Sequence, residues 1–103
     1  MDRIEKLKEF LERSPNDAFL MHALALEYVK KGDDATAKEL FEGLLQKEEN
    51  YVGSYYHLGL LYERMEEEEK AISIYKKGMQ EAKVAGDNHA FNELQAAYEN
   101  LVY

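Results

Sequence analysis

Residues 24–28 read LALEY, and residues 58–62, which lie 34 positions further along the chain, read LGLLY. The same offset relates residues 37–41 (AKELF) to residues 71–75 (AISIY). A fixed period of this length indicates a repeat architecture, in which each unit is one helical pair that cannot bury its apolar face alone. Because repeat arrays usually bind other proteins, the period favours an interaction protein over an enzyme.

The composition suits a single all-α domain. A chain of 103 residues is long enough to bury one hydrophobic core. Pro15 is the only proline and there are six glycines, so few residues interrupt helices. The chain has no cysteine, which excludes disulfides, thiolate metal sites and cysteine nucleophiles.

The start of the chain carries no targeting signal. Residues 1–10 (MDRIEKLKEF) are charged from the second position and lack the apolar segment of a secretory signal. No apolar stretch approaches the length of a membrane span. We therefore expect a cytoplasmic location and no membrane association.

The formal net charge of −8 bears on the choice of partner. An acidic chain repels phosphate backbones, so nucleic-acid binding would require a local basic patch. The adjacent basic pairs, Lys30–Lys31 and Lys76–Lys77, are expected in the last turns of helices, where they complement the helix dipole. We expect no nucleic acid and a protein partner that is neutral or basic.

Turn and capping residues divide the chain into six predicted helices. Residues 14–17 (SPND) end the first helix and cap the second, and Gly32 ends the second. Asp33-Asp34, Asn50 and Gly86-Asp87 provide the later caps. The predicted helices cover about residues 2–13, 18–31, 34–47, 51–65, 68–83 and 88–101.

The run Glu66-Glu67-Glu68-Glu69 has two interpretations. Four carboxylates could bind a metal ion. In the first turn of a helix, however, negative charge stabilises the dipole, and four adjacent side chains fan out around the helix instead of converging on one ion. We therefore predict no metal site here.

The chain resembles the tetratricopeptide repeat (TPR) family. The matching positions of the first unit are Met21, Leu24, Ala25, Tyr28, Ala37 and Phe41, and those of the second are Tyr55, Leu58, Gly59, Tyr62, Ala71 and Tyr75. The resemblance implies that small residues let paired helix backbones approach closely while large residues fill the space around them. Gln95 stands where a small residue is usual, which suits a terminal capping helix.

The resemblance implies one TPR-like domain over residues 1–103, in which about six antiparallel helices form a right-handed superhelical array. Two full repeats are flanked by half-repeats. The expected parts are an N-terminal helix in 2–17, a first repeat in 18–51, a second repeat in 52–85 and a C-terminal capping helix in 86–103.

In this family the first helix of each pair lines a concave groove, which the resemblance implies as the peptide-binding site. The groove residues expected here are His22, Leu26, Val29, Tyr56, His57, Leu60, Arg64, His89 and Asn92. Their neighbours on the same faces include Phe19, Gly53, Glu63, Glu93, Ala96 and Glu99. The apolar members either anchor a bound peptide or pack on one another, and the sequence leaves both readings open.

The three histidines His22, His57 and His89 fall one on each groove-lining helix. Related modules that grip a C-terminal carboxylate have Lys, Asn and Lys at these positions. Leu26 and Glu93 stand where such a clamp expects Asn and Arg, so a carboxylate would meet repulsion. A three-histidine zinc site would need nitrogens within about 2.1 Å of one ion, which side-by-side helices make difficult. The third reading is three separate polar side chains.

No enzymatic pattern is present: the chain has no Gly-rich phosphate loop, nucleophile motif or H-E-x-x-H spacing. We predict no catalytic, cofactor-binding or metal-ligating residues, and no cofactor. The predicted function is binding of a peptide or protein segment in the groove. The alternative is a structural repeat protein that self-associates through its array ends, where Leu101, Val102 and Tyr103 form an apolar cluster. The expected state is a monomer or weak homodimer.

Overall fold

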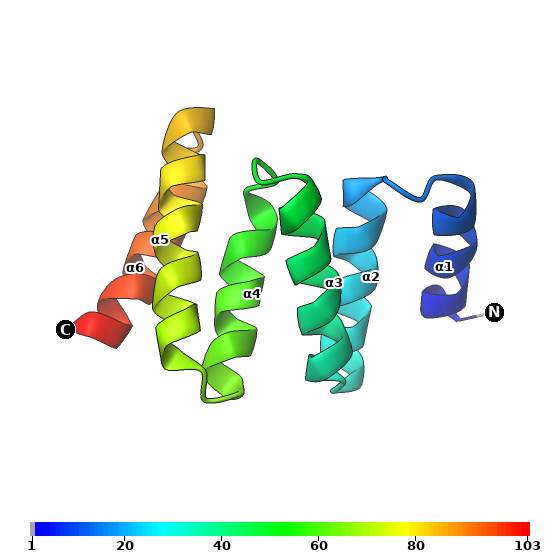
Figure 1. Ribbon diagram of the computed structural model, residues 1–103, viewed down its shortest axis with the longest axis horizontal. Helices are drawn as coiled ribbons and strands as arrows, with labels where there is room; N and C mark the ends of the chain where they lie inside the picture. Colours follow the sequence, from blue (N-terminus) through cyan, green and yellow to red (C-terminus); the bar gives the residue numbers. More distant parts are fainter. Residues whose placement is uncertain (1) are drawn as a thin grey trace. The chain divides into compact units, whose positions relative to one another are not determined.

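The computed structural model describes residues 2–103, which form six α helices and no strand (Figure 1). The helices are α1 (Arg3–Arg13), α2 (Ala18–Lys31), α3 (Asp34–Lys47), α4 (Gly53–Arg64), α5 (Glu68–Ala85) and α6 (Asn88–Val102). The all-α repeat fold expected from the sequence is confirmed. The chain divides into two compact units: unit 1, residues 1–48, contains α1 to α3, and unit 2, residues 49–103, contains α4 to α6.

Side-chain caps and left-handed glycines set most of the helix boundaries. The carboxylates of Asp17, Asp33 and Asp87 each accept a hydrogen bond from the backbone N–H three residues ahead, at 3.0–3.1 Å. These bonds satisfy donors that a helix N-terminus leaves unpaired. Gly32 and Gly86 end α2 and α5 with φ of 89° and 71°, a conformation that glycine adopts without a Cβ penalty. These predicted caps and stops are confirmed.

Two predicted helix-end features are wrong. Asn50 does not cap α4, because α4 begins at Gly53 and the capping position, Val52, makes no side-chain cap. Instead the backbone closes the turn: the Ser54 N–H donates to the Tyr51 carbonyl at 3.2 Å. Lys76–Lys77 lies in the middle of α5, not in its last turn, because the helix continues to Ala85.

The acidic run that precedes α5 is divided between a turn and a helix. Glu68 and Glu69 occupy the first turn of α5, where negative charge is favourable. Glu66 has a φ of 59°, the left-handed conformation, so it reverses the chain after α4. The Glu67 carboxylate lies 3.2 Å from the Lys70 ammonium.

Unit 1 is built on a small core between its three helices. Leu7 of α1 packs with Ala23 and Leu24 of α2, all buried. Partly buried side chains extend this core: Ile4, Leu11, Leu20, Tyr28 and Leu40. Between α2 and α3 the side chains of Ala25, Ala37 and Phe41 are completely buried.

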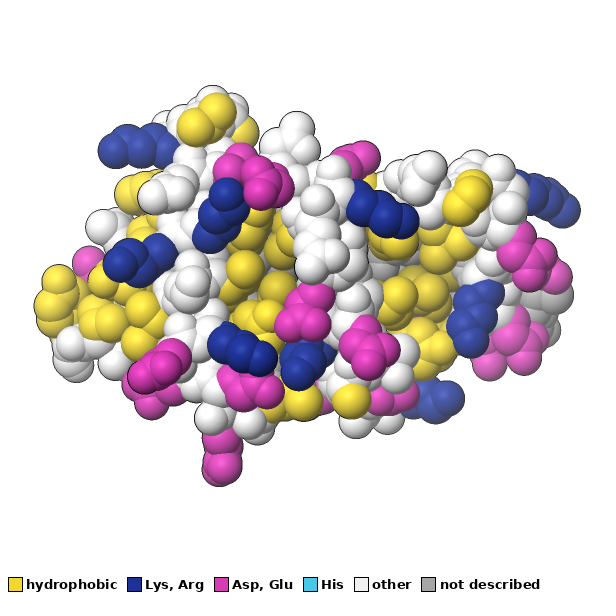
Figure 2. Space-filling model, in the orientation of Figure 1, with side chains coloured by type: hydrophobic (Ala, Val, Ile, Leu, Met, Phe, Trp, Pro, Cys, Tyr) yellow, Lys and Arg dark blue, Asp and Glu magenta, His cyan; other side chains and the backbone are white. Residues whose placement is uncertain are grey.

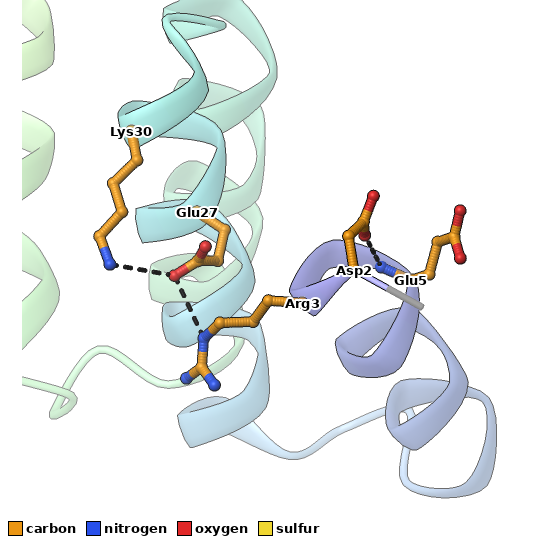
Figure 3. A network of polar contacts seen from close by, with 5 residues as sticks. All are labelled: Asp2, Arg3, Glu5, Glu27 and Lys30. Atoms are coloured by element: carbon orange, nitrogen blue, oxygen red, sulfur yellow. Dashed lines mark hydrogen bonds and ion pairs between the residues drawn. The ribbon is translucent and has the colours of Figure 1, made fainter.

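One carboxylate also joins α1 to α2 within unit 1 (Figure 3). Glu27 Oε2 lies 3.2 Å from Arg3 Nε and 3.3 Å from Lys30 Nζ. Because Arg3 and Lys30 are largely exposed, solvent screens these pairs. At the start of α1, Asp2 accepts a hydrogen bond from the Glu5 N–H at 2.8 Å.

Unit 2 depends on two glycines that allow close helix contact. A Cβ on Gly59 would lie 2.0 Å from Cε1 of the completely buried Tyr75 ring, so α4 approaches α5 only because that atom is absent. A Cβ on Gly78 would lie 2.6 Å from the Tyr55 Cβ. The small-residue role predicted for Gly59 is observed, whereas the contact at Gly78 was not anticipated.

Gln95 on α6 is exposed, although it matches the buried positions Ala25 and Gly59. The opposite side of α6 is buried through Leu94 and Ala97.

Candidate functional site

Unit 2 contains a hollow of ≈ 280 Å³ between α4 and α6, called here the α4–α6 hollow. Its lining residues come from these two helices: Tyr56, Leu60, Glu63, Glu93, Ala96, Ala97 and Asn100. On each helix they recur at intervals of three and four residues, which places them on one face. The two faces therefore form opposite walls of one site.

The lining is apolar at its base and has small residues on one wall. Tyr56 and Leu60 are half-buried on α4, and Ala97 is buried on α6. Ala96, next to it, is exposed. Two consecutive alanines leave the space that larger side chains would fill, so this part of the surface is concave.

Two carboxylates give the hollow its charge. Glu63 Oε2 accepts a hydrogen bond from the Tyr75 hydroxyl at 2.5 Å, which restrains the position of that carboxylate. Burial of the phenol raises the pKa of Tyr75, and the hydrogen bond to Glu63 raises it further. Glu93 is exposed on the facing helix. No lysine or arginine is among the lining residues, so the hollow carries negative charge.

Only part of the predicted groove set in unit 2 lines this hollow. The hollow is lined by Tyr56 and Leu60. It is not lined by the other predicted residues of this unit, which are His57, Arg64, His89 and Asn92. The His57 ring lies edge-on to Tyr56, with centroids 5.8 Å apart. Burial lowers the pKa of His57, and the negative charge of Glu93 opposes that shift. Arg64, His89 and Asn92 are exposed.

The remaining predicted groove residues belong to unit 1. His22, Leu26 and Val29 are half-buried on α2. The His22 ring makes an edge contact with Phe41, a core residue of α3, with centroids 5.5 Å apart. His22 therefore contributes to packing within its own helical pair, whatever else it contacts.

Two residues of the α4–α6 hollow, Ala97 and Asn100, were not among the predicted groove residues. Their spacing in the sequence could have identified them, because Ala97 lies four residues and Asn100 seven residues after Glu93, on the same face of a helix.

Comparison with known proteins identifies the family. The tetratricopeptide repeat model matches residues 52–83. A crystal structure of a tetratricopeptide repeat domain protein from Salinibacter ruber is 40% identical, covering 82% of this chain and 94% of that one, with a TM-score of 0.80. The chain belongs to the tetratricopeptide repeat family. Among curated proteins, none matches the sequence of this TPR chain.

Two further structures are similar to this TPR chain. A solution structure of a tetratricopeptide repeat domain protein from Salinibacter ruber is 40% identical, covers 85% of this chain and 89% of that one, and has a TM-score of 0.81. A solution structure of a Bordetella parapertussis protein shares the fold, with a TM-score of 0.83 at 20% identity, and covers 98% of this chain and 88% of that one. TPR domains are in general protein–protein interaction modules and typically non-enzymatic.

Residues 2–103 contain no group of three or more His, Cys, Asp or Glu side chains placed to hold a metal ion. None of the described helices combines the length and apolar character needed to cross a membrane.

Two other hollows differ from the α4–α6 hollow in charge. In unit 1 a hollow of ≈ 340 Å³ is lined by Lys8, Leu11, Glu12, Pro15, Met21 and Leu40. Figure 2 shows apolar side chains at the surface between α1 and the α2–α3 pair, with charges of both signs around them. In unit 2 a hollow of ≈ 250 Å³ between α5 and α6 is lined by Lys76, Met79, Gln80, Lys83, Phe91 and Tyr98.

Proposed function

We propose that this TPR chain binds a peptide or protein segment along the first helices of its repeats, and that the α4–α6 hollow is one contact site. The supporting observation is the hollow itself, whose lining combines the half-buried side chains of Tyr56 and Leu60 with the polar side chains of Glu63, Glu93 and Asn100. Sites of this composition bind ligands because apolar contact supplies affinity and a few polar groups supply orientation.

The other predicted groove residues are proposed as binding residues within each unit. They are His22, Leu26 and Val29 on α2 of unit 1, and His57, Arg64, His89 and Asn92 on α4 and α6 of unit 2. The support for these residues is the family resemblance and their positions on first helices. With a net charge of −8, the chain favours a neutral or basic partner over an acidic one. A cytoplasmic location is part of the same proposal, because TPR proteins are often cytoplasmic.

The test is affinity capture from the native host's lysate with three baits, analysed by mass spectrometry. The baits are wild type, Ala96→Trp and Val84→Trp. Ala96 is exposed and lines the hollow, so a Trp there occupies it without disturbing the core. Val84 is 87% exposed on α5 and provides the matched control for a surface Trp.

The expected result is a protein captured by wild type and by Val84→Trp but lost with Ala96→Trp. Circular dichroism and thermal unfolding establish that all three baits fold alike. If all three baits capture the same set, the hollow is not a binding site and the proposed function fails.

A second candidate function is self-association through the array ends. It is supported by exposed apolar side chains on the first and last helical segments, since Phe10 is 48% exposed and Tyr103 is 93% exposed. Burial of such groups between copies would be favourable. Size measured over a range of concentrations separates the two functions: a groove-binding protein stays monomeric or weakly dimeric, whereas a self-associating one grows in mass and loses that growth when Tyr103 is replaced by Ser.

A further inference from the structure

We propose that the α4–α6 hollow receives one lysine or arginine side chain of the bound segment. This proposal rests on the proposed function and deepens it by naming the chemistry of one anchor. The occupant is a basic side chain of a protein segment, with its aliphatic stem against the base of the hollow and its cationic head between Glu63 and Glu93.

The base of the hollow suits the stem of such a side chain. Lysine and arginine bury their methylene groups along apolar surface while their charged heads remain near polar groups. Tyr56, Leu60 and Ala97 supply that apolar surface. The Tyr56 ring adds a partner for a cation, because an ammonium or guanidinium group is attracted to an aromatic face.

The charges of the hollow select a cation. Glu63 and Glu93 come from opposite helices, and no lining residue is lysine or arginine. A carboxylate in the hollow would meet two negative groups, which is the opposite of the clamp considered from the histidine positions. The half-buried His57 does not offset this charge near neutral pH, because burial lowers its pKa.

The surroundings strengthen the negative charge and fix one carboxylate. A neighbouring hollow of ≈ 230 Å³ shares Glu63 and is lined also by Glu66, Glu68 and Leu101. The hydrogen bond from Tyr75 holds Glu63 in place before a ligand arrives. A carboxylate has about four acceptor sites, so one bond to Tyr75 leaves acceptor capacity for a cation. The other two hollows lack this arrangement, since the lining of one includes both Lys8 and Glu12 and the lining of the other includes Lys76 and Lys83.

The test begins with a displayed library of random peptides, selected on wild-type protein and then screened against Ala96→Trp. Peptides that bind wild type but not Ala96→Trp use the hollow. The proposal expects these peptides to be enriched in lysine or arginine at one position. Synthetic peptides carrying that residue, or norleucine in its place, are then measured against Glu93→Gln and Glu69→Gln. Glu69 is exposed on α5, outside the hollow and outside the groove-lining helices, so its variant matches the loss of charge.

The expected result is a loss of about tenfold in affinity with Glu93→Gln and little change with Glu69→Gln. Glu93→Gln should not weaken binding of the norleucine peptide. Hollow-dependent peptides without an enriched basic residue would overturn the basic anchor while the proposed function stands. Equal losses with Glu93→Gln and Glu69→Gln would do the same. If no selected peptide responds to Ala96→Trp, both proposals fail.

Discussion

The Tyr75 hydroxyl donates a hydrogen bond of 2.5 Å to the Glu63 carboxylate and so connects the core of unit 2 with the edge of the α4–α6 hollow. Tyr75 is completely buried on α5, whereas Glu63 is half-buried on α4. A buried hydroxyl needs a partner, and a carboxylate near a low-dielectric core gains from a fixed donor. The same bond therefore serves the stability of the helical pair and the geometry of the candidate site.

Tyr75→Phe should lower the free energy of unfolding by about 1.5–3 kcal/mol, because it removes a hydrogen bond to a charged group and leaves the ring in place. Urea unfolding followed by circular dichroism measures the change. Tyr98→Phe on α6 is the control, since the Tyr98 side chain is only half-buried and a surface change of this kind alters stability by about 0.5 kcal/mol or less. A Tyr75→Phe protein as stable as the control would show that the bond contributes nothing.

Gly59→Ala should destabilise unit 2 by about 1–3 kcal/mol, because the added methyl would overlap the Tyr75 ring and force the helices apart. Gly43→Ala is the matched control. Gly43 lies inside α3 with no atom within 4 Å of an added Cβ, so alanine there should stabilise by about 0.5–1 kcal/mol through its better helix propensity. Thermal unfolding compares the two variants, and a destabilised Gly43→Ala or a stabilised Gly59→Ala contradicts the packing described here.

Much of the fold could be predicted from the sequence, because its signals are local. Asp17, Asp33 and Asp87 cap helices through contacts three residues away, and Gly32 and Gly86 end them through their own dihedral angles. The 34-residue period then pairs the helices without any distance information. The start of α4 was not predicted correctly, because the turn that precedes it is closed by backbone hydrogen bonds and not by a capping side chain.

The candidate site was predicted less well, because it depends on contacts between helices distant in sequence. The helical face of α4 was expected to contribute Tyr56 and Leu60, and both line the hollow. The hollow itself, however, exists because the small side chains of Ala96 and Ala97 on α6 leave space opposite Tyr56 and Leu60. The packing of His22 on Phe41 likewise arises from a helix–helix contact, which no spacing within α2 reveals.

The pKa of Tyr55 makes the protein sensitive to alkali. The Tyr55 hydroxyl donates to the Glu49 carbonyl at 2.6 Å, and burial, with smaller contributions from Glu81 and Glu49, raises its pKa from 10.0 to about 12. Since the folded state holds this proton more tightly than the unfolded state, its stabilisation is complete below pH 10 and is lost as the pH rises towards 12. Unfolding free energies of wild type and Tyr55→Phe across this range measure the effect, and identical pH dependence in the two proteins would contradict it.

His57 should make the stability of unit 2 fall in mild acid. Burial lowers its pKa below the usual 6.5, so the unfolded chain binds the proton more readily than the folded one. Stability is therefore retained above about pH 6.5 and declines as the pH falls through that value. His57→Gln should flatten this decline, and Glu93→Gln should lower the pKa of His57 further because it removes the opposing negative charge. Proton NMR titration of the His57 imidazole, together with urea unfolding at several pH values, measures both effects. A His57 pKa at or above 6.5 would mean that burial does not control this side chain. A pKa that rises in Glu93→Gln would contradict the opposing effect of the Glu93 charge.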